Sequence, residues 1–107
     1  MKRLRFIGAS QDDLSGFPDE ARRAAGYELW QVQKGLMPSD WKHMVGVGQG
    51  AYEIRIHVLG EWRVIYVAKF ADTVCVLHAF QKKTQKTRHE DIELAKKRYK
   101  EIGERYE

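Results

Sequence analysis

Apolar and polar residues alternate most regularly in the middle of the chain, and this period-two pattern is typical of β-strands. It predicts three strands, at residues 52–58, 62–68 and 73–80, with short connections between them. Strands at this spacing indicate an antiparallel meander. The third strand is apolar at both alternate positions, which is typical of a strand that is buried on both faces.

A helical period flanks this region on both sides. Apolar residues recur on one stripe from Ala21 to Val32, and Pro18 precedes them at a position that favours a helix start. A short helical turn is predicted at Ser10, and a second long helix along the stripe at residues 92–102. The chain therefore places helices before and after the three strands.

The order of these elements predicts the fold class. Residues 2–8 alternate as an opening strand does, and residues 36–50 are expected to form a connecting loop. The order strand, helices, three strands, helix indicates an α+β fold. We expect a small antiparallel β-sheet with the N-terminal helices and the C-terminal helix packed on one face. Residues 1–107 would form a single domain, because the length leaves no room for two.

The hairpin between the first two strands of the meander decides which side chains are free for chemistry. A turn centred on Gly60 would set His57 opposite Arg63. The apolar side chains then share one face, namely Tyr52, Ile54, Ile56 and Val58 with Trp62, Val64 and Tyr66. A slip by one residue would bury Arg63 among aliphatic side chains as an unpaired charge, which is costly. The predicted sheet thus has an apolar face for the helices and an open face that carries Arg55, His57 and Arg63.

Composition limits the class of protein. The chain has 107 residues, of which 43% are hydrophobic, and no apolar run approaches the ~18–20 residues of a membrane span. Its single cysteine, Cys75, excludes an internal disulfide framework and fits a reducing cytosol. We expect a cytoplasmic protein that does not interact with a membrane.

The positive charge of the chain is concentrated in one place. Lysine and arginine number 19 and aspartate and glutamate 15, which gives a net charge of +4. Lys82, Lys83, Lys86 and Arg88 fall within residues 82–88, a stretch without acids that we call the cationic segment. The rest of the chain is balanced, with 15 basic and 15 acidic residues. A phosphate or another anion is therefore the expected partner of this segment.

The third strand of the meander would deliver the cationic segment to an edge of the open face, close to Arg63 or Arg55. Arginine forks match phosphate geometry, and lysines add compact charges. With His57 as a general acid or base, such a surface can bind a phosphodiester, stabilise a pentacoordinate phosphorane and move protons without a metal. The alternative is a solvated basic loop beside two arginines that are paired with Glu53 and Glu61.

Other reactive side chains carry less information about function. His43, His57, His78 and His89 do not fall at metal-ligand spacing, so we expect neither a metal nor another cofactor. Cys75 lies between two valines and is expected to be a small buried side chain rather than a nucleophile. His78, in an apolar strand, is likewise expected to be a core or rim histidine.

Three motifs follow one another in the second half of the chain. They are a G-x-W-R strand at residues 60–63, an H-A-F-x-K-K-T-x-K-T segment at residues 78–87 and an A-x-x-R helix at residues 95–98. In this combination the sequence from Tyr52 to Tyr99 resembles the RelE/ParE superfamily of bacterial and phage toxins, and specifically its HigB branch. The resemblance implies a fold of helices packed on a small antiparallel sheet.

Members of this superfamily are typically the toxin half of a type II toxin–antitoxin pair. The resemblance implies an endoribonuclease that inhibits translation by cutting mRNA in the ribosomal A site. The 2′-hydroxyl would attack the neighbouring phosphate without a metal. A cognate helix-turn-helix antitoxin is the implied partner in a heteromeric complex, and operator DNA would be bound only through that antitoxin.

Carried over to the matching positions, the resemblance implies a cleavage site made of Arg55, Arg63, Lys82 and Lys83, with His57 as a candidate for proton transfer. Phe80 would be a stacking or wall residue beside these cations. Lys86 and Arg88 would bind RNA.

Two positions depart from the pattern of RelE-type nucleases. Glu53 stands where those enzymes tend to place a cation, and no tyrosine follows the basic pair within residues 84–87. The general base is therefore open between His57, Lys82 and groups of the ribosomal RNA. A ParE-like gyrase poison and a non-catalytic RNA- or protein-binding module are the alternative functions.

Overall fold

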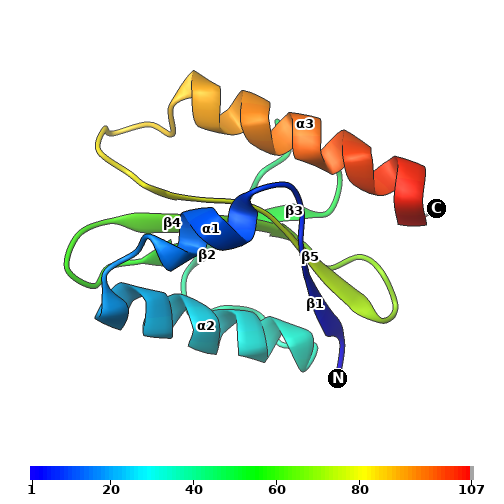
Figure 1. Cartoon of the computed structure of the whole chain (residues 1–107), viewed down its shortest axis with the longest axis horizontal. Coiled ribbons are helices and arrows are strands. Elements are labelled where there is room, and N and C mark those ends of the chain that lie inside the picture. Colours follow the sequence, from blue (N-terminus) through cyan, green and yellow to red (C-terminus); the bar gives the residue numbers. More distant parts are fainter. Residues whose placement is uncertain (107) are drawn as a thin grey trace.

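The computed structural model describes residues 1–106, which form three helices and five strands (Figure 1). In chain order these elements are β1 (Arg3–Phe6), α1 (Ser10–Ser15), α2 (Asp19–Gln33), β2 (Trp41–His43), β3 (Ala51–Ile56), β4 (Trp62–Val67), β5 (Thr73–Gln81) and α3 (His89–Tyr106). The elements predicted from the sequence are present, and β2 is an additional strand within the expected loop at residues 36–50. None of the helices within residues 1–106 has the length and apolar content needed to cross a lipid bilayer.

The five strands form one mixed sheet in the order β1-β5-β4-β3-β2. β3, β4 and β5 are the predicted antiparallel meander, and β2 adds an antiparallel edge strand. β1 pairs with β5 in parallel, from Arg3 opposite Thr73 to Phe6 opposite Val76. The α+β class is confirmed, but the sheet is not wholly antiparallel. The alternation in residues 2–8 predicts a strand and contains no information about its partner, which lies far along the chain.

Helices cover both faces of the sheet (Figure 1). On one face, Leu29 of α2 shares a buried cluster with Ile54 and Val64. On the other face, Ala95 of α3 shares a buried cluster with Leu77. The prediction that all helices share one face is therefore wrong. The reason lies in β5, because its side chains are apolar in both directions and both faces of this strand need cover.

β3 and β4 pair with Arg55 opposite Arg63, two residues away from the predicted register. Residues 57–61 connect the two strands, and Leu59 and Gly60 have positive φ angles of 56° and 126°. A shift of two residues keeps every side chain on its predicted face, because the side-chain period of a strand is two. The α2 face does carry the predicted apolar residues, with Tyr52 opposite Tyr66, Ile54 opposite Val64 and Ile56 opposite Trp62.

Candidate functional site

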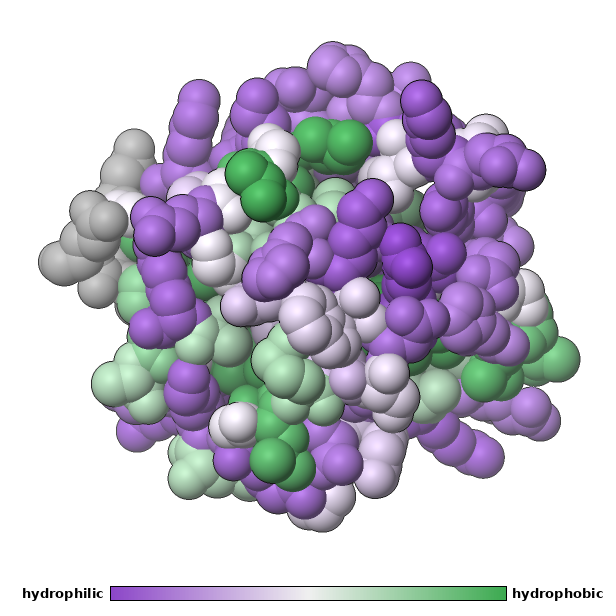
Figure 2. All heavy atoms as spheres, turned by 180° about the vertical axis from the view of Figure 1, so that it is seen from behind, coloured by the Kyte–Doolittle hydropathy of each residue, from purple (hydrophilic) through white to green (hydrophobic). Residues whose placement is uncertain are grey.

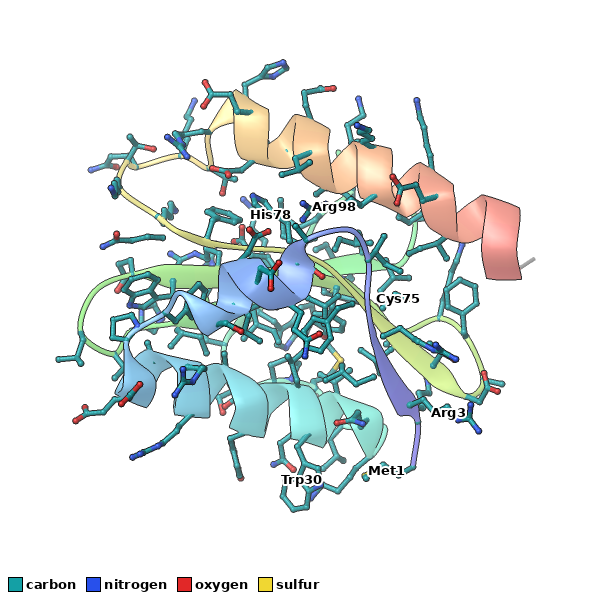
Figure 3. All side chains as sticks on the ribbon, in the orientation of Figure 1. Met1, Arg3, Trp30, Cys75, His78 and Arg98 are labelled. Atoms are coloured by element: carbon teal, nitrogen blue, oxygen red, sulfur yellow. The ribbon has the colours of Figure 1, made fainter. Side chains whose placement is uncertain are left out.

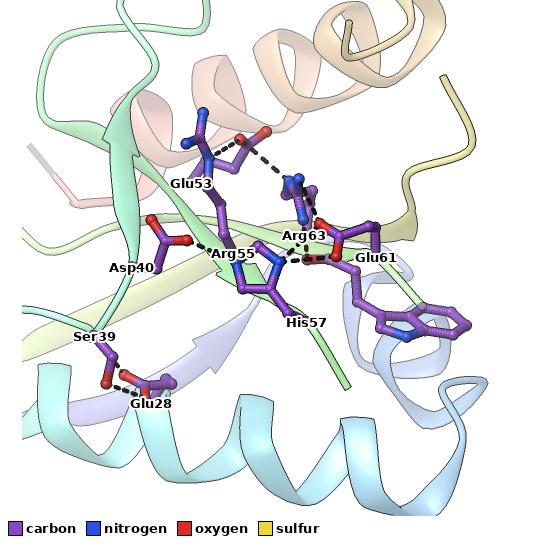
Figure 4. Close-up of polar contacts among 9 residues, drawn as sticks. Glu28, Ser39, Asp40, Glu53, Arg55, His57, Glu61 and Arg63 are labelled. Carbon is purple, nitrogen blue, oxygen red and sulfur yellow. Dashed lines mark hydrogen bonds and ion pairs between the residues drawn. The ribbon is translucent and has the colours of Figure 1, made fainter. Parts of the chain in front are cut away.

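Two arginines lie on neighbouring strands of the sheet, and one carboxylate lies between them (Figure 4). Arg55 of β3 and Arg63 of β4 occupy directly opposed positions, where like charges repel. Glu53 lies on the same face of β3, and its Oε1 is 3.7 Å from Nε of Arg55 and 3.6 Å from Nε of Arg63. The Glu53 side chain is buried, so its negative charge is compensated by two guanidinium groups.

The guanidinium group of Arg63 is engaged at all three nitrogens. Nη1 donates to the carbonyl of Trp62 at 2.9 Å, Nη2 donates to Oε1 of Glu61 at 3.1 Å, and Nε faces Glu53. Only 4% of Arg63 is exposed, so the prediction of an open face with two free arginines is wrong for this residue. Its pairing with Glu53 and Glu61, the alternative considered from the sequence, is what the structure shows. Arg55 keeps 32% of its side chain exposed.

The same series of contacts continues to His57 and Asp40. Nδ1 of His57 lies 2.8 Å from both carboxylate oxygens of Glu61, and Nε2 lies 2.6 Å from Oδ2 of Asp40. The hydrogen bond with Asp40, and then that with Glu61, raises the pKa of His57 above its usual 6.5. The hydrogen bonds from His57 and Arg63 lower the pKa of Glu61. Both ring nitrogens face acceptors, an arrangement that only the doubly protonated, cationic imidazole satisfies.

The loop that carries Asp40 is fixed by α2. Glu28 of α2 accepts hydrogen bonds from the backbone N–H of Ser39 at 2.8 Å and from its hydroxyl at 2.7 Å (Figure 4). The backbone N–H of Arg55 donates to the carbonyl of Asp40 at 2.9 Å. The helix on one face and the neighbouring strand together place Asp40 where it meets His57.

These side chains alternate in sign along the sheet. In order they are Asp40, His57, Glu61, Arg63, Glu53 and Arg55, and we call them the charge ladder (Figure 4). With His57 protonated, the positive and negative charges of the ladder are equal in number. The ladder therefore contributes no net charge, and a net attraction for anions has to come from other side chains.

The cationic segment supplies that attraction. The backbone N–H of Lys82 donates to the carbonyl of Glu61 at 2.8 Å, which anchors the start of the segment beside β4. Among the side chains that the structure describes, those of residues 1–103, no carboxylate forms an ion pair with Lys82, Lys83 or Lys86. From behind, the upper right of the molecule, where this segment lies, is covered by hydrophilic side chains (Figure 2).

Two adjoining hollows lie along the cationic segment. The Arg63 hollow, of about 570 Å³, is lined by Glu61, Arg63, Lys82, Lys83, Thr84 and Gln85. The Arg55 hollow, of about 390 Å³, is lined by Lys42, Met44, Glu53, Arg55, Lys82, Gln85, Lys86, Thr87 and Ile92. Lys82 and Gln85 line both hollows, so we treat the two as one basic surface. Unpaired ammonium groups beside a half-exposed guanidinium match the charge and geometry of phosphate groups.

The structure brings together some of the predicted site residues and not others. Those that line the basic surface are Arg55, Arg63, Lys82, Lys83 and Lys86. Phe80 is 8% exposed and stacks on His78 at a centroid distance of 4.9 Å, which leaves little of its ring for a base. Arg88 pairs through Nε with Oδ2 of Asp91 at 3.1 Å, at the start of α3 and outside both hollows. His57 also lies outside both linings and is bound to its two acids.

Comparison with known proteins then decides the family. Residues 12–100 match the family described as phage-derived protein Gp49-like (DUF891). The chain belongs to this family. It is a RelE-like toxin family of toxin–antitoxin systems, so the predicted resemblance is confirmed at that level. A comparison with curated proteins gives no match.

Two residues of this Gp49-like site are ones that the sequence does not single out. Lys42 lines the Arg55 hollow from β2. The hydroxyl of Thr87 donates to Oε2 of Glu53 at 3.2 Å and so ties the cationic segment to the sheet. The alternation of Trp41, Lys42 and His43 is a strand signal, but three residues are too few for a period to stand out.

A second polar cluster in this Gp49-like protein joins α3 to α1 and β5. Nε2 of His78 lies 2.8 Å from Oδ1 of Asp91, and Nη1 of Arg98 donates to Asp13 at 3.2 Å and to the carbonyl of Leu77 at 2.8 Å. Figure 3 shows His78 and Arg98 between the two helices. His78 is buried, which confirms its expected place in the core or at its rim.

Other candidate sites in the Gp49-like chain are unreactive or lie elsewhere. Cys75 is buried, and burial raises the pKa of its thiol, as expected of a small core side chain. Up to residue 103, the last whose side chain the structure describes, no three His, Cys, Asp or Glu side chains are grouped so that they could hold a metal ion. A third hollow of about 210 Å³ lies on the α2 face beside the stacked rings of Tyr52 and Tyr66. It contains none of the predicted site residues.

Proposed function

We propose that this Gp49-like protein is the toxin of a type II toxin–antitoxin system, and that it is a HigB-like endoribonuclease which cuts mRNA on the ribosome. The observation that carries the proposal is the basic surface, where the lysines of the cationic segment lie beside the partly exposed Arg55. Membership of a toxin family supports it. Cations held on a rigid sheet stabilise the charge that develops on a phosphate in the transition state.

In the proposed reaction, the 2′-hydroxyl of one nucleotide attacks the adjacent phosphorus. The hydroxyl proton passes to a base, the O2′–P bond forms and the P–O5′ bond breaks. The 5′-oxygen leaves with a proton from an acid. The products are a 2′,3′-cyclic phosphate and a 5′-hydroxyl. We assign no metal to this step, because lysine and arginine side chains can neutralise the phosphorane.

The roles of the residues follow from their exposure and partners. We assign Lys82 and Lys83 to the scissile phosphate and Lys86 with Arg55 to a neighbouring one, since these side chains line the basic surface. His57 would act through its charge and not by proton transfer, because both ring nitrogens are bound to carboxylates. The base is then Lys82 or a group of the ribosomal RNA.

The proposal also specifies the partners. The substrate would be mRNA held by the ribosome. A family of toxins from toxin–antitoxin systems suggests an antitoxin partner. We infer that the cognate antitoxin carries a helix-turn-helix domain, and that operator DNA is bound only through it in the heteromeric complex.

Primer extension on a message in a cell-free translation system tests this function. We expect new 5′ ends on the translated message and none on the same RNA without ribosomes. An intact message together with a block of DNA supercoiling by gyrase would contradict the proposal and establish the ParE-like alternative. RNA binding without new ends would instead indicate a non-catalytic module.

A further inference from the structure

We propose that Glu53 is the positioning residue of the basic surface: its carboxylate directs Arg55 and Arg63 and, through Thr87, fixes the cationic segment above the sheet. The inference rests on the proposed function, because it assigns a role within the same RNA-cleaving site. A buried carboxylate in the middle of a cationic surface is costly unless it serves the geometry of that surface.

The contacts of Oε1 carry the first part of the inference. This oxygen lies 3.7 Å from Nε of Arg55 and 3.6 Å from Nε of Arg63. Both Nε atoms are buried and have no hydrogen-bond partner, so the Glu53 carboxylate is the group that compensates them. Because Arg55 and Arg63 occupy directly opposed positions on β3 and β4, their like charges would repel each other without it. Glu53 therefore helps to direct both arginines, and for Arg63 it acts together with the carbonyl of Trp62 and the carboxylate of Glu61.

The contact of Oε2 carries the second part. It accepts the hydrogen bond from the hydroxyl of Thr87, at 3.2 Å. The start of the cationic segment is held by the backbone bond from Lys82 to Glu61, and its end by N–H groups of α3 that donate to the carbonyl of Arg88. Thr87 joins the segment to the sheet between these two ends. Through this bond Glu53 also controls how far the lysines of the segment lie from the arginines of the sheet.

A positioning role and a purely electrostatic role predict opposite effects when Glu53 is neutralised. Glu53→Gln makes the surface more positive, which by charge alone strengthens the binding of phosphate. It also removes the group that directs the arginines, and a misplacement of about 1 Å can cost about a hundredfold in rate. Glu93→Gln is the matched control, because Glu93 lies half-exposed on α3 outside both hollows and loses the same charge.

The test is single-turnover cleavage of mRNA in ribosome complexes, with the maximal rate separated from the half-saturating toxin concentration. For Glu53→Gln we expect the maximal rate to fall by about tenfold to a hundredfold without a rise in the half-saturating concentration. Thr87→Val keeps the shape and loses the hydroxyl, and should lower the maximal rate by about tenfold. Glu93→Gln should cleave as the wild type does. A Glu53→Gln protein that cleaves as fast as the wild type, or faster, overturns the inference.

Amide hydrogen exchange on the purified protein distinguishes a failure of this inference from a failure of the proposed function. We expect the amide of Lys82, whose hydrogen bond to the carbonyl of Glu61 holds the start of the segment, to exchange about tenfold faster in Glu53→Gln and Thr87→Val, and at an unchanged rate in Glu93→Gln. Unchanged exchange in both site variants overturns the inference even where the wild type cleaves RNA. A wild type without cleavage overturns the proposed function, and the exchange data then still decide whether Glu53 anchors the segment. If Glu53→Gln does not fold, Thr87→Val gives the answer.

Discussion

The hydrogen bonds of His57 with Asp40 and Glu61 raise the pKa of His57, and the bond between His57 and Glu61 also lowers the pKa of Glu61. The pKa of His57 is raised, so its pairing stabilises the fold fully below its unfolded value of 6.5 and is lost as pH rises through the folded pKa. The pKa of Glu61 is lowered, so its contribution is present above its unfolded value of 4.5 and is lost as pH falls through the folded pKa. The two contributions therefore coincide between these unfolded values, in mildly acidic solution.

We predict that the wild type loses more stability than His57→Gln when the pH is raised from about 6 to about 8, because the wild type gives up the charged imidazole. The difference in the free energy of unfolding should stay below about 1 kcal/mol, since His57 and its partners are exposed and solvent screens such pairs. Urea unfolding at the two pH values measures it. His89→Gln is the control, because His89 is 84% exposed and should leave the loss unchanged. An equal loss in wild type and His57→Gln would contradict the assignment.

Among the elements, α2 and the loop before β3 use glycine in different ways. Gly26 lies on the exposed side of α2, where an added Cβ would meet nothing within 4 Å. Gly48 lies under α3, where an added Cβ would stand 2.5 Å from Cζ of Tyr99. The hydroxyl of Tyr99 also donates to the carbonyl of Gln49 at 2.7 Å. The close approach of α3 to this loop therefore requires a glycine at position 48, whereas no contact requires one at position 26.

Alanine at these two positions should change stability in opposite directions. Gly26→Ala should raise the free energy of unfolding by about 0.5–1 kcal/mol, because it removes the entropic cost of glycine within a helix. Gly48→Ala should lower it by about 1–3 kcal/mol, because the Tyr99 ring has to move. Denaturant unfolding measures both. A destabilised Gly26→Ala protein would contradict the interior position of this residue in α2.

Helices and strands differ in how far the sequence predicts them. Long periodic segments, such as α2 and β3, are readable because many residues repeat one pattern. The two-sided apolar pattern of β5 requires a cover on each face, but it does not say which helix covers which face, and α3 lies on the face opposite α2. The pairing of β1 was not predictable, because it depends on contacts with residues far along the chain.

For the site, the sequence predicted the meeting of strand arginines with the cationic segment, because β4 and β5 are neighbours in any meander. It did not decide whether Arg63 is free or paired. That depends on the side-chain directions of Glu53 and Glu61, which strand periodicity does not define beyond the face. Lys42 is not predictable, because β2 is too short to give a periodic signal.

Across the whole molecule, charge is divided between a neutral ladder and a set of free lysines. Arg55 and Arg63 belong to the ladder and are balanced by acids. The excess of positive charge at the basic surface therefore comes from its lysines, which are Lys42, Lys82, Lys83 and Lys86. In this arrangement the lysines attract RNA, and the ladder holds the arginines in a fixed geometry.

The salt dependence of RNA binding should show which lysines neutralise phosphate groups. For single strands, the slope of log K against log salt is about 0.7 for each phosphate that is neutralised. Lys82→Ala, Lys83→Ala and Lys86→Ala should each reduce the slope by about 0.7. Lys97, exposed on α3, should leave it unchanged when replaced by alanine. Fluorescence anisotropy with a short labelled RNA over a range of salt measures the slope, and equal slopes for all four variants would contradict the proposed contacts.

The most direct measurement is the mapping of mRNA ends in cell-free translation with Lys82→Ala and Lys97→Ala. Both substitutions remove one positive charge, but Lys82 lines both hollows and Lys97 lines neither. We predict that Lys82→Ala lowers the rate of cleavage by about a hundredfold, the usual effect of losing one group that stabilises transition-state charge, whereas Lys97→Ala cleaves as the wild type does. Equal cleavage by the two variants would contradict an RNA-cleaving site at the basic surface.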